Sequence, residues 1–517
     1  MRPGPATILA ACVMALPACS DRPLSPGSAS DGGDAGADAA ADGAAGAAPG
    51  MVDWGVPIGS QPSAAAAGTT VVKAVIPTDD GGAVVAGSFT GSVAFAPDAV
   101  RDGTPGAGFV ARYRSDQRLV WVHVLGADGG RVVIADMASL GDGEIAIAGW
   151  FDGTLVEARD ADPIAVTSAG ASDLFVARLA SDGSVRWIRR SGGPGDDIAR
   201  GVAIGTAAGA PSIAITGAVS EGAVFGPGED VETRAPASAG PVFAARLRGD
   251  GSLVWARFAG GGVPGQGYGV AHDATGAVAV TGYVNGVAPF GNDAAGAPAA
   301  IAPAVGRAFV ARWDVDGRLL WAQPLGGPAG EGDAIALAAG GAVIAVGLFE
   351  GEARFGAAAS APRLTADSPG RPGAYVAAFG PDGATTWARR LAGSGVRPWR
   401  LRARADGDLL LAATFGGGVI LDPDGASPLG LASSGGTDGV FAALAGDGSV
   451  RWATAGGGPG DDQGSDFAAA ADGAAWAVGT YFGPAAFGQG AAFGAGTAVR
   501  LDSGTDGASF LLRVLPP

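Results

Sequence analysis

Acidic side chains are the residues of this chain whose type and spacing could do chemistry. Two adjacent pairs, Asp196-Asp197 and Asp461-Asp462, end similar glycine-rich segments. A ring of such carboxylates could hold Ca²⁺, which takes six to eight oxygen ligands. No single segment has the dense Asp/Asn spacing of a calcium loop, and carboxylates in turns usually accept bonds from backbone N–H groups. We therefore expect a structural role and no cofactor, with Ca²⁺ as the alternative.

Other catalytic signatures are sparse. The chain has only two histidines, His123 and His272, and its sequence shows no nucleophile elbow and no zinc or phosphate-binding spacing. Carboxylate chemistry of the glycosidase or lyase type is the enzymatic chemistry that stays open. The sequence favours a protein that is not an enzyme.

One aromatic residue departs from the pattern of the others. Trp399 lies between Arg397 and Arg400, where related segments carry an acidic turn. We expect these three residues on a loop, as candidates for ligand binding, with packing as the competing interpretation.

The charge balance excludes one class of partner. Thirty-three basic and 50 acidic residues give a formal net charge of −17, and a field of that sign repels phosphate backbones. We expect no nucleic-acid partner.

Both cysteines, Cys12 and Cys19, lie at the N-terminus. Residues 6–16 form an apolar run too short to span a bilayer, which predicts a signal peptide over residues 1–18. The segment Leu16-Pro17-Ala18-Cys19 resembles a bacterial lipobox, and this resemblance implies that Cys19 carries the lipid. An ordinary secretory signal is the alternative.

Residues 19–50 are rich in Ala, Gly, Asp and Ser and predict a disordered tether. A tether after a lipidated cysteine predicts an exported, membrane-anchored protein. By analogy with bacterial sorting rules, Ser20 after the cysteine indicates the outer membrane or cell surface.

Two aromatic series repeat through residues 51–517 at intervals of about 66 residues. The first consists of Trp54, Trp121, Trp187, Trp255, Trp321, Trp387 and Trp452. The second precedes most of these tryptophans by 11 or 12 residues and consists of Phe109, Phe175, Phe243, Phe309, Tyr375, Phe441 and Phe510. Each aromatic opens an alternating run, an Asp-Gly turn such as Asp316-Gly317 follows, and a second run contains the tryptophan. This pattern predicts a β-hairpin.

A second hairpin completes each repeat. It contains a glycine at an equivalent strand position, as in Gly149, Gly217 and Gly479, with Ala413 in one repeat. Glycine inside a strand indicates a bulge or a close backbone approach. Four antiparallel strands per repeat predict an all-β, seven-bladed β-propeller over residues 51–517. The unmatched strands at the two ends, around Trp54 and Phe510, should pair and close the ring.

The repeats resemble a bacterial β-propeller repeat family. The residues that carry the likeness are Gly192-Gly193-Pro194-Gly195-Asp196-Asp197, Ile213-Ala214-Ile215-Thr216-Gly217 and Asp173-Leu174-Phe175-Val176-Ala177-Arg178-Leu179. The resemblance implies cell-surface or extracellular placement and no shared catalytic residues.

Blade topology places the long connections of every repeat on one face, because both tight hairpin turns lie at the opposite end. That face collects Asp128, Glu331 and Asp333 beside the two aspartate pairs. We expect a binding or scaffold module that presents this face to a protein or glycan. A polysaccharide-active enzyme and an envelope spacer without a ligand are the alternatives.

Overall fold

The computed structural model describes residues 51–59, 68–157, 163–237, 240–260, 264–292, 298–327, 329–368, 370–488, 499–503 and 507–515. The described residues form antiparallel β-sheets, and their one helical segment is a 3₁₀ turn, η1 (Ala339–Gly341). The predicted all-β class is confirmed. In these ranges no helix has the length and apolar character needed to cross a membrane. The signal peptide, Cys19 and the tether lie outside the described residues.

The strands form sets of four, in which the first strand pairs with the second, the second with the third and the third with the fourth. Each set is named here by its first strand. In chain order, the first three sets are β2 (Gly68–Pro77), β3 (Ala83–Ala94), β5 (Ala107–Tyr113) and β6 (Leu119–Asp128); β7 (Val132–Gly141), β8 (Glu144–Phe151), β11 (Asp173–Leu179) and β12 (Val185–Ser191); and β13 (Ile198–Ala207), β14 (Ala210–Ala218), β17 (Val242–Arg248) and β18 (Leu253–Ala259).

The later sets follow the same order, except that β28 is the fourth strand of one set and the first strand of the next. They are β19 (Gln266–His272), β20 (Val278–Asn292), β21 (Pro298–Trp313) and β22 (Leu319–Leu325); β23 (Gly330–Leu337), β24 (Val343–Phe349), β27 (Gly373–Phe379) and β28 (Thr385–Ala403); β28, β29 (Leu409–Leu421), β30 (Leu429–Leu444) and β31 (Val450–Gly457); and β32 (Gln463–Ala469), β33 (Ala475–Tyr481), β36 (Ala508–Leu515) and β1 (Met51–Ile58).

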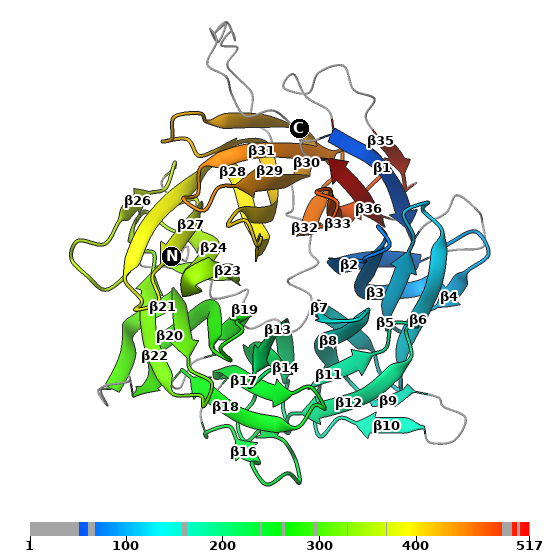
Figure 1. The fold of residues 1–517 in the computed structure, drawn as a ribbon, viewed down its shortest axis with the longest axis horizontal. Helices are drawn as coiled ribbons and strands as arrows, with labels where there is room; N and C mark the ends of the chain where they lie inside the picture. The colour runs from blue at the N-terminus through cyan, green and yellow to red at the C-terminus, as the bar shows by residue number, and fades with distance from the viewer. Residues whose placement is uncertain are drawn as a thin grey trace, which may run out of the picture.

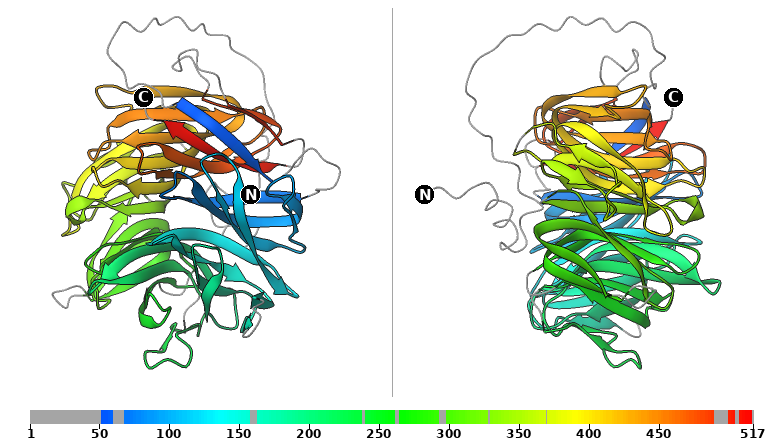
Figure 2. Two further views of the ribbon diagram at one scale, coloured as in Figure 1. Left: turned by 45° about the vertical axis from the view of Figure 1, so that its right-hand side comes forward. Right: turned by 90° about the vertical axis from the view of Figure 1, so that its left-hand side faces the viewer.

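The sheets stand around a common centre, with first strands such as β7, β13 and β19 inside and fourth strands such as β12 and β18 outside (Figure 1). Each first strand contacts the first strand of the next set, and β32 contacts β2. Turned by 90°, the same sheets are seen from the side (Figure 2).

The hydrophobic core is divided among the spaces between neighbouring sheets. Phe175 of the β7 sheet packs in one cluster with Ala86 of the β2 sheet. Another cluster joins Trp476 and Leu511 of the β32 sheet to Phe109 of the β2 sheet. The alternating pattern of the sequence therefore buries both faces of a sheet, since each sheet has a neighbour on either side.

The strands at the two ends of the chain pair with each other. β1 lies antiparallel to β36, with Met51 opposite Leu515 and Ile58 opposite Ser509, and Figure 1 shows the two side by side. The ion pair between Arg513 and Asp53, at 2.6 Å, joins the same two strands.

A β-bulge occurs at the same place in every first strand, and the recurring glycine of the second strand lies opposite it, except in β29, where Ala413 takes its place. In the β7 sheet the register shifts between Ile134 and Asp136. A Cβ atom on Gly149, in β8, would overlap the carbonyl oxygen of Val133. The predicted close approach is thus confirmed. The backbone that leaves no room for a side chain at Gly149 belongs to the first strand of the same sheet.

The connections between second and third strands, expected as loops, contain further strands. They are β4 (Val100–Asp102), β9 (Thr154–Glu157), β10 (Ile164–Thr167), β15 (Val224–Phe225), β16 (Thr233–Arg234), β25 (Glu352–Arg354), β26 (Arg363–Thr365), β34 (Pro484–Phe487) and β35 (Val499–Asp502). In two sets the paired strands themselves lengthen instead, as with β20 and β21 between Asn285 and Arg307.

These added segments, which we name the strap hairpins, lie against the fourth strand of the preceding sheet. β9 pairs with β6, and β34 pairs with β31. The Gly356 N–H, just after β25, donates to the Pro324 carbonyl of β22 at 3.1 Å. The Gly59 N–H, just after β1, donates to the Ala94 carbonyl of β3 at 3.2 Å. Neighbouring sheets are therefore connected by backbone hydrogen bonds in addition to the packing of their faces.

Candidate functional site

The centre of the molecule holds an ionic network built on the first strands. Arg400, in β28, forms two hydrogen bonds with Asp136 of β7, at 2.7 and 3.0 Å. Arg402 bonds Asp466 of β32 at 2.5 and 3.0 Å. β28 and β7 belong to sheets that do not neighbour each other, so this ion pair joins the first strands of two non-adjacent sheets.

The two aspartates of this network also bond backbone groups. Asp136 accepts the Val202 N–H of β13 at 2.9 Å, and Asp466 accepts the Val75 N–H of β2 at 2.9 Å. Although burial opposes ionisation, the neighbouring Arg402 and Arg400 lower the pKa of Asp466 below its ordinary value. The network therefore links the first strands of several sheets through fixed charges.

The second candidate arginine is also occupied by carboxylates. Arg397 contacts Glu331 at 2.6 Å and Asp333 at 3.2 Å, both from β23. Burial opposes its charge, but these two carboxylates raise its pKa further above the ordinary value. The structure thus brings together Arg397, Glu331 and Asp333, which the sequence placed on one face as separate candidates.

Trp399 lies within strand β28 rather than in the loop that the sequence suggested. It occupies the bulge of this strand, between Pro398 and Arg400 in the register. Its indole N–H donates to the Thr414 hydroxyl at 2.8 Å, and the Arg397 guanidinium stacks 4.8 Å from its ring. The side chain is half-buried, so packing in the central network uses much of its surface.

The acidic pairs at the glycine-rich segments bond the chain's own backbone. Asp197 is fully buried and accepts the Gly193 and Ser220 N–H groups, each at 2.6 Å. Asp462 accepts the Gly458 N–H at 2.5 Å and the Phe482 N–H at 2.8 Å. Burial raises the pKa of Asp197 and of Asp462 to about 6 against these hydrogen bonds.

The first member of each pair bonds the preceding sheet. Asp196 accepts the Ser172 hydroxyl at 2.5 Å, and Asp461 accepts the Thr437 N–H at 3.1 Å. Asp128, the remaining acidic candidate, is exposed at the end of β6, opposite Thr154 of β9. The aspartates of the two pairs therefore hold turns and the starts of strap hairpins in place.

Each buried aspartate has a second carboxylate beside it that the sequence did not single out. A Cβ atom on Gly192 would lie 2.5 Å from Asp173 Oδ1 and 3.0 Å from Asp197 Oδ2, so only glycine leaves room for both oxygens. Gly457 stands in the same relation to Asp438 and Asp462. The first glycine of the repeated motif is thus required by a carboxylate pair.

The two carboxylate pairs differ in whether a basic side chain balances their negative charge. Arg190 forms an ion pair with Asp173. Alanine, Ala455, stands in the equivalent position of β31, and Asp438 and Asp462 contact no basic side chain among the described residues. In the part of the chain that is described, no group of three or more His, Cys, Asp and Glu is arranged to hold a metal ion. Binding of Ca²⁺ stays a prediction.

The two histidines lie far apart in the fold and have separate partners. His123 Nε2 lies 3.1 Å from Glu157 Oε2, and His272 Nδ1 lies 3.2 Å from the Ala277 carbonyl. Burial lowers the pKa of His272 to about 4, so this side chain is neutral at physiological pH.

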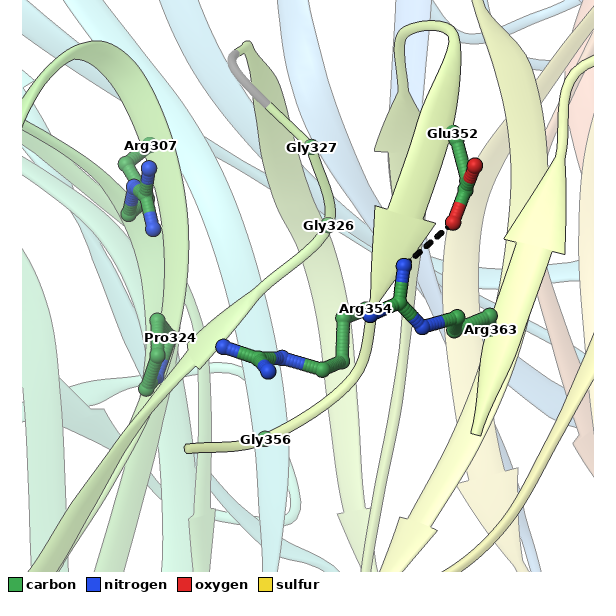
Figure 3. Close-up of a pocket in the computed structure, with 8 residues that line it drawn as sticks. All are labelled: Arg307, Pro324, Gly326, Gly327, Glu352, Arg354, Gly356 and Arg363. Carbon is green, nitrogen blue, oxygen red and sulfur yellow. Dashed lines mark hydrogen bonds and ion pairs between the residues drawn. The ribbon is translucent and has the colours of Figure 1, made fainter. Parts of the chain in front are cut away.

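A cavity of about 410 Å³ lies where the β25–β26 strap hairpin meets the end of β22. Figure 3 shows its lining side chains, which come from two neighbouring sheets. The lining consists of Arg307, Pro324, Gly326, Gly327, Glu352, Arg354, Gly356 and Arg363. No sequence pattern predicts this site, because its three arginines are isolated in the chain and only the strap hairpin brings them together.

Comparisons with known proteins supply no family. No protein-family model matches the chain, and no curated protein matches it in sequence. A Bacteroides caccae protein of unknown function matches in structure at 12% identity and a TM-score of 0.31, over 67% of this chain and 89% of its own. The protein U3-55K matches at 10% identity and 0.29, over 69% and 90%. Rhamnogalacturonan lyase YesW matches at 10% and 0.27, over 78% and 76%.

Proposed function

We propose that residues 51–517 form a closed seven-bladed β-propeller. Supporting this are the four-strand sets, the circuit of contacts from β2 to β32 and back, and the pairing of β1 with β36. The strap hairpins run in the same direction around the centre, each on the preceding sheet. A scaffold of this kind is rigid and displays its connecting segments on one face.

We further propose that this propeller is exported, anchored by a lipid on Cys19, and acts as a binding module at the outer membrane or cell surface. The observation that carries the binding role is the contrast between the arginines of the central network and those of the cavity beside β22. Arg400 is held by Asp136, whereas the cavity is lined by charged residues of the β25–β26 strap hairpin. We therefore expect a ligand to bind beside the strap hairpins.

The two alternatives are less well supported. The acidic candidates for polysaccharide chemistry, Asp197 and Asp462, spend both carboxylate oxygens on backbone N–H groups. A spacer without a ligand would not require a cavity lined by charged side chains at the rim.

The lipid anchor is tested by changing the sorting cysteine. Cys19→Ser removes the sulfur that would carry the lipid, so the protein should move from the membrane fraction to the soluble fraction. Cys12→Ser, within the same leader, is the matched control and should leave the protein in membranes. A Cys19→Ser protein that is exported and still pellets with membranes would refute the anchor.

The binding role is tested with the soluble Cys19→Ser protein. It should bind saturably to envelopes isolated from cells that lack this protein, and excess unlabelled protein should compete. Binding that rises linearly without saturation would contradict the proposal and favour the spacer.

A further inference from the structure

We infer that the cavity beside β22 binds the carboxylate of an acidic sugar, such as a uronate unit of an envelope glycan. This inference rests on the proposed binding role and names the ligand class for it.

The cavity concentrates positive charge, and the described residues neutralise only part of it. Arg307 and Arg354 make no ion pair with any residue that the structure describes, and the buried Nε of Arg307 has no hydrogen-bond partner there. Arg363 is paired with Glu352. By contrast, Arg390 and Arg513 each contact two aspartates. Two uncompensated guanidinium groups in a chain of net charge −17 are suited to an anion.

The guanidinium groups approach the cavity from different elements. Arg307 belongs to β21, Arg354 to β25 and Arg363 to β26. In Figure 3, Arg354 extends from its strand toward the side of the cavity that carries Arg307 and Pro324. A planar guanidinium can bind both oxygens of a carboxylate with two parallel hydrogen bonds. An anion between Arg307 and Arg354 would join the β19 and β23 sheets.

The walls indicate what else the ligand carries. Among the described residues that line the cavity, three glycines and one proline supply the remaining surface, and none has a branched aliphatic or aromatic side chain. An acidic peptide would find no apolar pocket for its neighbouring side chains, whereas the hydroxyls of a sugar acid can bond Glu352 and exposed backbone groups. The volume suits a ligand of one or two sugar rings. The protein's negative field disfavours longer polyanions.

The test uses the full-length Cys19→Ser protein and isothermal titration calorimetry. Galacturonate and its dimer should bind, and galactose, the matched neutral sugar, should bind more weakly by about tenfold or more, since a hydrogen bond to a charged group is lost. Arg354→Gln and Arg307→Gln should each weaken uronate binding by a similar factor. Arg318→Gln, an exposed arginine at a tight turn of the same β19 sheet, should leave it unchanged.

Several results would overturn the inference. These are equal binding of galacturonate and galactose, uronate binding that survives both cavity variants, and tighter binding of inorganic phosphate or of an oligoglutamate peptide. If the protein still binds envelopes saturably while galacturonate does not bind, the proposed function stands and the ligand class is wrong. Loss of both would refute the two together.

Discussion

At the scale of single residues, charged groups of this protein serve two different purposes. In the centre, Arg397, Arg400 and Arg402 are matched by carboxylates from other strands. In the cavity, Arg307 and Arg354 are left without acidic partners among the described residues. Removing one partner of a buried ion pair typically costs about 3–5 kcal/mol, so the central arginines are poor positions at which to seek ligand specificity.

The carboxylate pair of Asp438 and Asp462 predicts a dependence of stability on pH. Burial raises the pKa of Asp462 to about 6, above its ordinary value of 3.8. A group whose pKa is higher in the folded state stabilises the fold while it is protonated, and this contribution is lost as the pH rises from about 4 to about 6. In the wild type, the free energy of unfolding should therefore decrease by up to about 3 kcal/mol over this pH range. Asp462→Asn should abolish this decrease.

Urea unfolding at pH 4, 5, 6 and 7 measures this difference between wild type and variant. Asp182→Asn is the control. Hydrogen bonds from Ser184 lower the pKa of Asp182, so its titration lies below this window. Parallel pH profiles for wild type and Asp462→Asn would show that the pair does not titrate as proposed.

The sequence predicted part of these residue arrangements. It placed Asp197 and Asp462 in turns that bond the backbone, because glycine-rich segments ending in aspartate have that chemistry. It did not connect them with Asp173 and Asp438, which lie in third strands of the preceding sheets and meet the motif only in space. The cavity arginines share no motif at all, so spacing along the chain could not reveal them.

At the scale of elements, the repeated glycines record contacts between strands. The glycine of each Asp-Gly turn has a positive φ, as Gly317 does at 74°, and a Cβ atom there would lie 2.7 Å from the Trp255 ring. The tryptophan series and the turn series are therefore two sides of one contact between neighbouring sheets. The sequence predicted the turn from Asp-Gly chemistry, but it could not show that the tryptophan of the preceding repeat lies over the glycine.

The glycine opposite each bulge gives a prediction at this scale. Gly149→Ala would force a Cβ atom into the Val133 carbonyl, and overpacking of this kind costs about 1–3 kcal/mol. Gly126→Ala is the matched control, since a Cβ atom at that position, in β6, meets nothing within 4 Å. Urea unfolding should separate the two variants. Equal stabilities would mean that the bulge adjusts at little cost.

Strap hairpins are the elements that the sequence missed. Their segments were expected as long loops because they lack the aromatic and glycine spacing of the main strands. Segments such as β9 and β34 are only four residues long, and besides their hairpin partners β10 and β35 each pairs with a strand of the preceding repeat. A pairing between short strands of different repeats leaves no local pattern, since register is set by tertiary packing.

At the scale of the whole molecule, the pairing of β1 with β36 determines whether the sheets behave as one unit. Deleting residues 51–58 would expose the backbone groups of β36 between Ser509 and Leu515. An exposed edge strand is a template for association. We expect the deletion to lower the midpoint of urea unfolding and to cause aggregation, measured by light scattering.

Deletion of eight residues from the tether, residues 31–38, is the control of matched length. It should leave both the unfolding midpoint and the scattering unchanged, because the tether precedes the first strand. If the deletion of residues 51–58 had equally little effect, the two ends of the chain would not hold the proposed ring together.

The same pairing has a consequence for biosynthesis. β1 precedes all the other described strands in the chain, and its partner β36 follows all of them. During synthesis β1 therefore lacks its hydrogen-bonding neighbour until β36 has left the ribosome. A nonsense codon just before Ser509 would leave most of the strands intact. Because β1 and β33 would both lose their partner, we expect quality-control proteases to degrade the product.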